Sequence, residues 1–123
     1  MKLPVYLYGH PVLRAVSEPL TPEYPDLDKL VEDMYACMYE SEGVGLAAPQ
    51  IGRNIRLVVI DADPVSDAFP ECAGRKFTLI NPEIEILEGK TEVRAEGCLS
   101  LPGLSENVPR IEHIRLNWVD EKF

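Results

Sequence analysis

The sequence has little basic charge and no long apolar run. Its 123 residues carry 12 Lys and Arg against 21 Asp and Glu, a formal net charge of −9 with the 2 His counted as neutral. So acidic a chain repels a phosphate backbone and an acidic membrane surface, and we therefore expect no direct nucleic-acid binding and no membrane association. No apolar stretch approaches the roughly 20 residues that cross a bilayer.

Cysteine is also scarce, and the N-terminus does not resemble a leader. The 3 cysteines, Cys37, Cys72 and Cys98, cannot all pair within one chain, so we expect reduced thiols. The first ten residues have one charge and an early proline in place of the basic patch and long apolar stretch of a secretory signal. These features predict a cytoplasmic protein.

The overall composition, 46% apolar and 27% charged, is that of an ordinary globular protein. The 11 prolines are spread along the chain, and no repeat or low-complexity tract is visible. We therefore predict a single domain over residues 1–123.

One helix is predicted in the first half. It starts near Pro25 and Asp26, with Asp26 as its capping residue, and Gly43 ends it. Its apolar positions recur at steps of three and four, which is typical of a helix with one buried face. Those positions are Leu27, Leu30, Val31, Met34, Cys37 and Met38. Residues 55–60 then predict a strand buried on both faces, and residues 61–76 predict a loop.

The second half predicts strands only. Residues 77–80 form one strand, and residues 84–87 with 91–94 indicate a hairpin that turns through residues 88–90. Residues 114–119 alternate apolar with polar side chains, which predicts a half-buried strand. The sequence stops where an antiparallel partner would begin, so we expect an unpaired edge and a chain that is a fragment.

The segment after the helix, residues 43–50, is rich in small side chains. Two glycines and two alanines leave its backbone uncovered, so its N–H and C=O groups can meet a second extended chain. Gln50 adds an amide that can both donate and accept. From spacing alone, the commoner interpretation is a helix C-cap and a tight loop packed on the core. The glycines match neither a phosphate-binding loop nor a dinucleotide fingerprint.

A second cluster, residues 96–100, surrounds Cys98. A thiolate beside Gly97 can approach a metal or a substrate closely, and the N–H groups after it can serve as oxyanion donors. Taken alone, a single cysteine is more often a small buried apolar residue. We assign no chemical role to Cys37 on the helix or to Cys72 in the loop.

Together and in this order, the two clusters resemble the first and second signature motifs of the peptide deformylases. These are metal hydrolases that remove the formyl group from new bacterial and organellar chains. Residues 8–14 also resemble the family's N-terminal segment, and residues 55–61 resemble its first core strand. The first motif, Gly-x-Gly-x-Ala-Ala-x-Gln, is met by Gly43, Gly45, Ala47, Ala48 and Gln50, and the second is met at all five positions from Glu96 to Ser100.

The resemblance implies a fold and a metal centre. The fold is α+β, with small mixed and antiparallel β-sheets packed around helices. The centre holds one Fe²⁺ or Zn²⁺ ion between a cysteine, two histidines and a water that attacks the formyl carbonyl. Cys98 is the implied thiolate ligand. The side-chain amide of Gln50 and the backbone N–H of Leu99 are the implied catalytic groups that stabilise the oxyanion.

The resemblance also implies a substrate, the N-formyl-methionyl end of a nascent polypeptide. Val44, Gly45 and Gly97 are the residues that would line this peptide and pair with it as a strand. Arg94 would lie near the mouth of the methionine pocket.

One family motif is absent. The third motif, His-Glu-x-x-His on a later helix, supplies two metal ligands one turn apart and a glutamate base, and this sequence nowhere has that spacing. His10 belongs to the N-terminal segment and His113 to the polar side of the last strand, and we interpret both as structural or surface residues. We therefore expect a domain that stops before the central metal-binding helix and is inactive alone.

Two other interpretations stay open. A non-catalytic remnant or split subunit would keep the peptide-binding edge and hold an extended chain by strand addition. A cysteine hydrolase would use Cys98 as its nucleophile and His10 or His113 as its base. The neighbouring Glu96 and the whole second motif fit metal ligation better.

Overall fold

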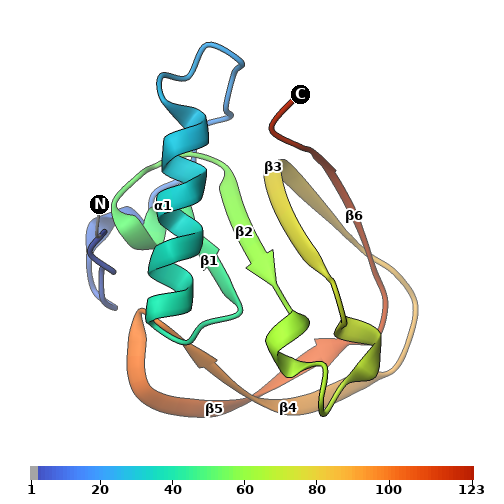
Figure 1. The fold of residues 1–123 in the computed structure, drawn as a ribbon. Coiled ribbons are helices and arrows are strands. Elements are labelled where there is room, and N and C mark those ends of the chain that lie inside the picture. The colour runs from blue at the N-terminus through green and yellow to red at the C-terminus, as the bar shows by residue number, and fades with distance from the viewer. Residues whose placement is uncertain (1–2) are drawn as a thin grey trace.

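The computed structural model describes residues 3–123, so the first two residues of the expected domain lie outside the described part. Helix α1 packs against a four-stranded sheet of order β1-β2-β3-β6, and β4 pairs with β5 in a second sheet (Figure 1). Neighbouring strands run antiparallel in both sheets, so the predicted α+β class is confirmed. The bounds are α1 Leu27–Glu40, β1 Gly45–Ala47, β2 Leu57–Asp61, β3 Lys76–Ile86, β4 Thr91–Cys98, β5 Leu101–Ile111 and β6 Ile114–Val119.

Helix α1 forms where the sequence predicts it. Its six predicted apolar positions are all buried, because steps of three and four place them on one face. The predicted cap is wrong: Asp26 precedes the helix at φ 55°, in the left-handed region, and its side chain makes no capping hydrogen bond. The helix ends at Glu40, and the N–H of Gly43 donates to the carbonyl of Met38 at 2.9 Å. Gly43 thus closes the end of the helix from just outside it.

The core lies between α1 and the sheet that it covers. Its largest fully buried side chains are Met34, Met38, Leu46, Leu57, Val59 and Ile80. Fully burying one such side chain stabilises a fold by roughly 1.5–3 kcal/mol. In β2, buried Leu57 and Val59 alternate with half-buried Val58 and Ile60. The predicted strand exists, but burial on both faces is wrong, because α1 covers one face of the sheet (Figure 1).

The predicted hairpin between residues 84–87 and 91–94 is wrong. Strand β3 continues to Ile86 and pairs with β6, whereas β4 pairs with β5. The turn through residues 88–90 therefore carries the chain from one sheet to the other. A turn is a local signal, but the choice of partner depends on which faces can be buried together, and a short alternating pattern does not encode that.

Strand β6 lies where predicted, with more exposure than predicted. Ile114, Trp118 and Val119 keep 51%, 40% and 37% of their surface exposed, and Leu116 alone in this strand is half-buried. Strand β6 pairs with β3, and within residues 3–123 no further strand pairs with its other side.

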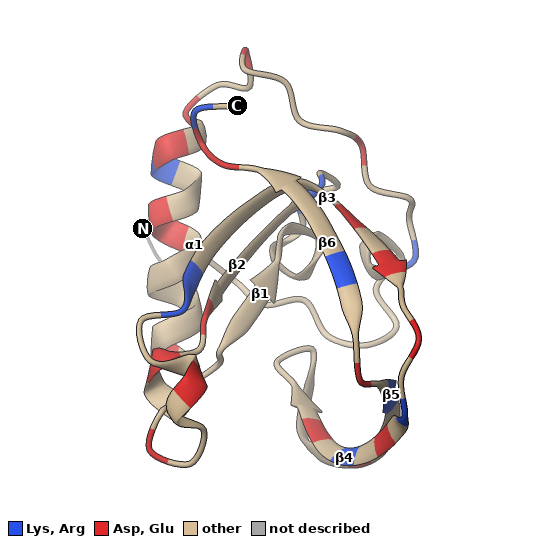
Figure 2. Cartoon of the chain, turned by 90° about the vertical axis from the view of Figure 1, so that its right-hand side faces the viewer, with Lys and Arg blue, Asp and Glu red and all other residues tan. Residues whose placement is uncertain are grey.

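The surface carries mostly acidic charge. Asp and Glu side chains lie on α1, on the connections and on both sheets, and Lys and Arg are fewer (Figure 2). The loop predicted over residues 61–76 contains two short 3₁₀ turns, Asp63–Val65 and Pro70–Cys72. No helix in the described part of the chain is both long and apolar enough to span a membrane.

Candidate functional site

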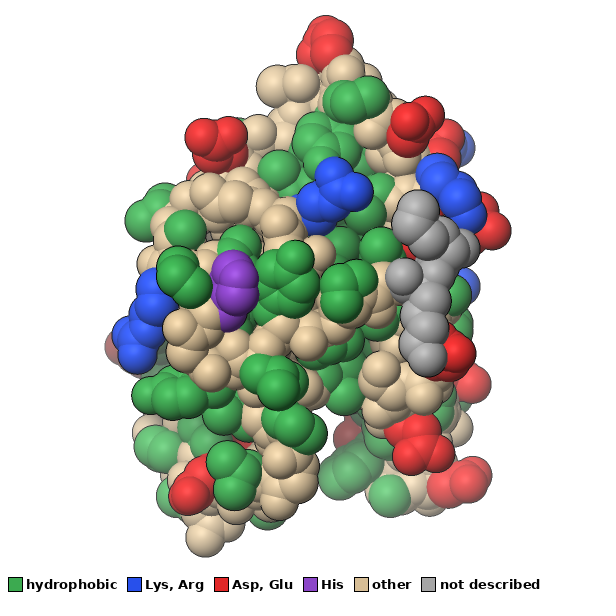
Figure 3. Space-filling model, turned by 90° about the vertical axis from the view of Figure 1, so that its left-hand side faces the viewer, with side chains coloured by type: hydrophobic (Ala, Val, Ile, Leu, Met, Phe, Trp, Pro, Cys, Tyr) green, Lys and Arg blue, Asp and Glu red, His purple; other side chains and the backbone are tan. Residues whose placement is uncertain are grey.

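A groove opens between the C-terminal end of α1, strand β1 and the turn that joins β4 to β5. Its volume is about 640 Å³, within the range typical of ligand sites. Both sequence clusters meet there, with residues 43–45 and Gln50 from the first and residues 97–99 from the second. In Figure 3 the molecule is hollowed at its lower edge, with hydrophobic side chains on both walls. The fold therefore brings together segments that lie about fifty residues apart in the sequence.

The side chain of Gln50 is held in one orientation. The 3₁₀ turn Ala48–Ile51 places its Oε1 atom where it accepts a hydrogen bond from the N–H of Ala47 at 2.9 Å. Its Nε2 atom lies 3.6 Å from Sγ of Cys98 and 3.2 Å from Oγ of Ser100. Because the carbonyl end of the amide is occupied, the N–H donors face the second cluster, where Sγ of Cys98 and Oγ of Ser100 accept them.

Cys98 is the exposed thiol of the described chain. It ends β4, where the register with β5 shifts between Gly97 and Cys98, and such an irregularity re-aims a side chain. Cys37 is buried in the core, and Cys72 is half-buried in the loop. The alternative that Cys98 is a small buried residue is therefore wrong, and Cys98 is the thiol that the groove presents.

Leu99 and Gly43 meet at the inner end of the groove. Leu99 lies in the two-residue turn between β4 and β5 and packs, half-buried, against the core. A Cβ atom at Gly43 would lie 2.9 Å from Cδ1 of Leu99. A larger residue at position 43 would require the flexible end of the Leu99 side chain to shift.

Strand β1 offers an open edge to the groove. It pairs with β2 from Gly45↔Ile60 onward, and within residues 3–123 no strand pairs with its other side. Val44, just before β1, lines the groove with 45% of its surface exposed, and Gly97 lines it from β4. A segment of extended peptide can add to such an edge as a further strand.

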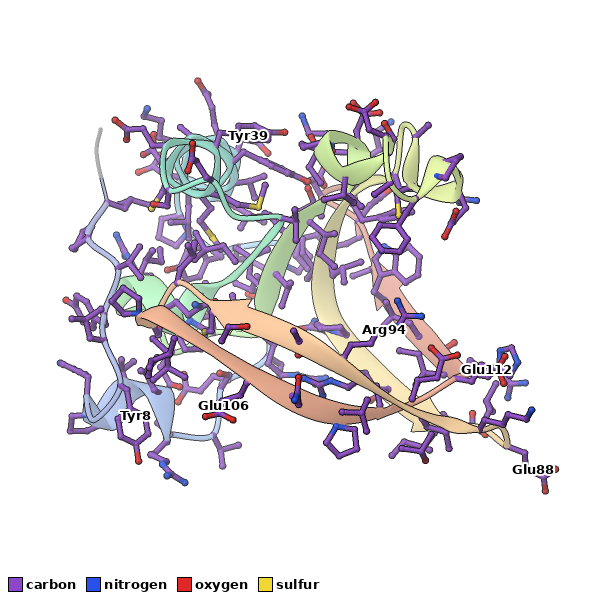
Figure 4. The ribbon with its side chains drawn as sticks, turned by 90° about the horizontal axis from the view of Figure 1, so that it is seen from below. Tyr8, Tyr39, Glu88, Arg94, Glu106 and Glu112 are labelled. Carbon is purple, nitrogen blue, oxygen red and sulfur yellow. The ribbon has the colours of Figure 1, made fainter. Side chains whose placement is uncertain are left out.

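Arg94 is not among the residues that line the groove. Its Nη2 atom lies 2.6 Å from Oε2 of Glu92 on the same strand. Figure 4 shows Arg94 part of the way along β4 toward the far end of that sheet, where Glu88 and Glu112 lie. Arg94 thus lies outside the groove that the other predicted site residues line, and its place beside a methionine pocket stays a prediction.

Glu96, two residues before Cys98, is engaged across the second sheet. Its carboxylate accepts two hydrogen bonds from Arg110 on β5, at 2.8 Å from Nε and 2.7 Å from Nη2. The hydrogen bond from the Arg110 guanidinium holds the pKa of Glu96 below its usual value. This forked pair fastens β4 to β5 just before the turn that carries Cys98 and Leu99.

Sequence reasoning missed the contacts that tie the two clusters together. The backbone N–H of Tyr6 donates to the carbonyl of Gln50 at 2.6 Å, and that of Tyr8 donates to the carbonyl of Ser100 at 2.8 Å. Ser100 itself is buried, and its hydroxyl lies beside the Gln50 amide. Backbone bonds leave no residue-type pattern, so only the place of Ser100 in the second motif could have signalled its part in the site.

The described residues supply one metal ligand at the groove. Within residues 3–123 no three His, Cys, Asp or Glu side chains gather as a metal-binding group. Nδ1 of His10 accepts the N–H of Val12 at 3.1 Å, and its ring lies 4.5 Å from that of Tyr6. Nε2 of His113 lies 3.8 Å from a carboxylate oxygen of Glu112. These donors do not fit a complete metal centre, and Cys98 alone offers a thiolate there.

The same placement bears on the cysteine-hydrolase alternative. Neither His10 nor His113 is among the residues that line the groove. A nucleophilic cysteine needs a base within hydrogen-bond reach. The described part of the chain therefore offers Cys98 no histidine base.

The structure is an antiparallel α+β domain that brings a thiol, an oriented amide and an open strand edge to one groove. Comparisons with known proteins assign this domain to a family. The family model described as polypeptide deformylase matches residues 2–123. The chain therefore belongs to the polypeptide deformylase family, a family of hydrolytic metalloenzymes.

Relatives of known sequence agree with this assignment. The peptide deformylase of Flavobacterium psychrophilum is 45% identical over 130 residues, which cover 100% of this chain and 67% of the relative. That of Flavobacterium johnsoniae is 42% identical over 130 residues, with coverages of 100% and 66%. This chain thus spans about two thirds of the length of the relatives that it matches.

Solved structures share the fold. The crystal structure of a peptide deformylase from Synechococcus elongatus in complex with actinonin has a TM-score of 0.85 and 35% identity, and the match covers 98% of this chain and 60% of that one. A peptide deformylase from Thermus thermophilus has a TM-score of 0.83 and 42% identity, with coverages of 99% and 68%. The arrangement of α1 and the two sheets is therefore that of the family.

Proposed function

We propose that the protein to which these residues belong is a peptide deformylase. It hydrolyses the N-formyl group from the formyl-methionine of nascent polypeptides in the cytoplasm. Water adds to the formyl carbon, and the bond between this carbon and the amide nitrogen breaks. The products are formate and a peptide with a free amino terminus. The observation that carries the proposal is the contact of the Gln50 amide with Cys98 beside an open strand edge.

Two groups of this chain act on the reacting carbonyl. As water adds, negative charge develops on the formyl oxygen, and the Nε2 donors of Gln50 together with the backbone N–H of Leu99 stabilise it. The hydrogen bond from Ala47 to Oε1 of Gln50 fixes the amide before the substrate arrives, so little reorganisation is needed at the moment of reaction.

Other groups hold the peptide. Val44 and Gly45 on one wall and Gly97 on the other line its extended backbone, and Arg94 lies toward the methionine side chain. Strand addition at β1 fixes the register of the substrate, so that the formyl end lies over the Cys98 turn.

Cys98 is the residue that would ligate an Fe²⁺ or Zn²⁺ ion. A thiolate is a soft, strongly donating ligand, which suits either ion. Since the described residues offer no complete set of ligands, we propose that the 123-residue chain alone binds metal weakly and is inactive. A second candidate, a non-catalytic chain that binds extended peptides, is favoured by the open edge of β1.

A chimera separates the two functions. Residues 1–123 are joined to the remaining C-terminal third of the Flavobacterium psychrophilum relative, the protein is loaded with Fe²⁺ or Zn²⁺, and formate release from formyl-Met-Ala-Ser is measured. The deformylase proposal expects formate from the chimera, none from residues 1–123 alone, and none from the chimera with Cys98→Ser. A folded, metal-loaded chimera that binds the peptide and releases no formate would support the non-catalytic function.

A further inference from the structure

Outside the groove, a hydrogen bond links the two ends of one of its walls, the segment of residues 41–44 that joins α1 to β1. The hydroxyl of Tyr39, in the last turn of α1, donates to Oδ2 of Asp61, the last residue of β2, at 2.5 Å. Neither residue belongs to the two sequence clusters, and neither lines the groove. Figure 4 shows Tyr39 at the end of α1, beside the strands of the sheet.

The wall between these two residues is a short, strained connection. It comprises residues 41–44 and joins α1 to β1. Glu42 within it has φ 59°, a left-handed conformation that is unfavourable for a residue with a side chain. Backbone bonds hold the helix side, where the N–H of Glu42 donates to Tyr39 at 3.1 Å and that of Gly43 to Met38 at 2.9 Å. Such a segment keeps its shape when both of its ends are fixed.

Asp61 holds the sheet side of the wall. Its backbone N–H donates to the carbonyl of Val44 at 2.9 Å, while its Oδ1 atom accepts the N–H of Asp63 at 3.0 Å. One residue thus joins the Tyr39 side chain, the start of the next loop and the backbone of Val44. The Tyr39–Asp61 contact therefore spans the wall and joins its two anchors.

The hydrogen bond from the Asp61 N–H to the Val44 carbonyl determines which backbone groups face the groove. Along a strand, the N–H and C=O of successive residues point alternately to the two neighbouring strands. Since Val44 is turned toward β2, the backbone groups of Gly45 point to the opposite edge, which carries no strand within residues 3–123. A slip of one residue would reverse this and remove the pairing groups from the groove.

We propose that Tyr39 and Asp61 are positioning residues that fix the register of β1 against β2. In this register the backbone of Gly45 faces an extended peptide in the groove. The inference rests on the proposed function in one respect, since it takes the peptide to pair with β1. The hydrogen bond to the Asp61 carboxylate raises the pKa of Tyr39, in agreement with a hydroxyl that donates to a charged acceptor.

Tyr35 offers a matched control. It lies one turn earlier on α1, its ring is stacked 6.1 Å from that of Tyr39, and its hydroxyl lies 2.9 Å from Oγ1 of Thr78 in β3. Tyr35→Phe removes a comparable hydroxyl contact between α1 and the sheet without touching the groove wall. Asp61→Asn keeps the backbone N–H that binds Val44 and an amide that can still form a hydrogen bond with the Tyr39 hydroxyl, although its single acceptor oxygen cannot serve both Tyr39 and the N–H of Asp63, so it serves as the conservative variant.

The test measures amide hydrogen exchange and peptide affinity in the chimera described above, kept free of metal so that the peptide is not hydrolysed. We expect Tyr39→Phe to speed exchange of the Asp61 amide and to weaken binding of formyl-Met-Ala-Ser-Ala by roughly threefold to tenfold. Tyr35→Phe should leave both unchanged, and Asp61→Asn should keep affinity within about twofold of the unaltered chimera. A backbone N-methylated form of the peptide, which cannot pair as a strand, should lose no affinity through Tyr39→Phe, whereas a general loss of structure would weaken both peptides.

The outcomes separate the two proposals. Equal exchange and equal affinity in Tyr39→Phe and Tyr35→Phe overturn the positioning role, as does an equal loss for the two peptides. If the unaltered chimera binds neither peptide, the proposed function of the groove fails, and the exchange rate of the Asp61 amide by itself then decides whether Tyr39 holds the wall.

Discussion

The amide Nε2 atom of Gln50 lies 3.6 Å from Sγ of Cys98, although 48 residues separate the two in the sequence. The contact joins a 3₁₀ turn after β1 to the last residue of β4, and these elements belong to different regions of the fold. The contact places a hydrogen-bond donor beside the exposed thiol. The site is therefore a product of tertiary structure built from two locally encoded clusters.

Metal binding by this chain should depend on Cys98 alone among its cysteines. Titration with Co²⁺, a spectroscopic substitute for Zn²⁺, should produce a weak thiolate charge-transfer band, because a single thiolate holds a metal far less firmly than a complete ligand set. The band should vanish in Cys98→Ser and persist in Cys72→Ser. Its survival in Cys98→Ser would contradict the assignment of the ligand.

Gly52 should tolerate alanine less well than Gly74 does. Both have positive φ, 83° and 70°, so either substitution strains the backbone by about 1–2 kcal/mol. A Cβ at Gly52 would also lie 2.7 Å from the ring of Tyr6, whereas nothing lies within 4 Å at Gly74. We expect Gly52→Ala to lower the free energy of unfolding by a further 1–3 kcal/mol, roughly the cost of overpacking. Denaturant unfolding of both variants measures the difference. Equal losses of unfolding free energy would show that the Tyr6 ring can move aside at little cost.

The contribution of Tyr39 to stability should disappear at alkaline pH. Its pKa rises from 10.0 to about 12 in the folded chain, because its hydroxyl donates to the Asp61 carboxylate. The folded state therefore binds this proton more tightly than the unfolded state does, and the resulting stability is complete below pH 10 and lost as pH rises toward 12. The difference in unfolding free energy between the unaltered chain and Tyr39→Phe should shrink over that interval. A difference that stays constant from pH 9 to 12 would contradict the hydrogen bond.

The Glu96–Arg110 pair should stabilise the β4–β5 sheet in neutral solution and fail in acid. The pKa of Glu96 lies below its ordinary 4.5, chiefly because Arg110 donates to it. The pair therefore stabilises the folded chain above pH 4.5, and this stabilisation is lost as pH falls through the lowered value. We expect Glu96→Gln to unfold more readily at pH 7 and to differ little from the unaltered chain in strong acid. Glu92→Gln, which removes the same charge from a contact within β4, is the control for a general effect of charge.

Several elements were predictable because their signals are local. The helical period of three and four placed six buried residues on α1 without knowledge of what they pack against. The strand over residues 57–61 and the final strand follow from β-branched and alternating patterns. The prediction that Asp26 caps the helix failed, because a suitable residue type does not guarantee the backbone geometry that brings its side chain to the first N–H groups of the helix.

Residue types at fixed spacings around Gln50 and Cys98 were enough to assign the family, and local patterns were enough to locate the helix and the strands other than β1 and β5. The contacts that these residues make depend on the folded arrangement of the whole chain. The partner of β4, the engagement of Arg94 with Glu92 and the bonds from the N-terminal segment to both clusters all join residues that are not set by local periodicity. Side-chain chemistry is written in the order of residues, whereas strand pairing and backbone contacts depend on which surfaces the whole chain can bury together.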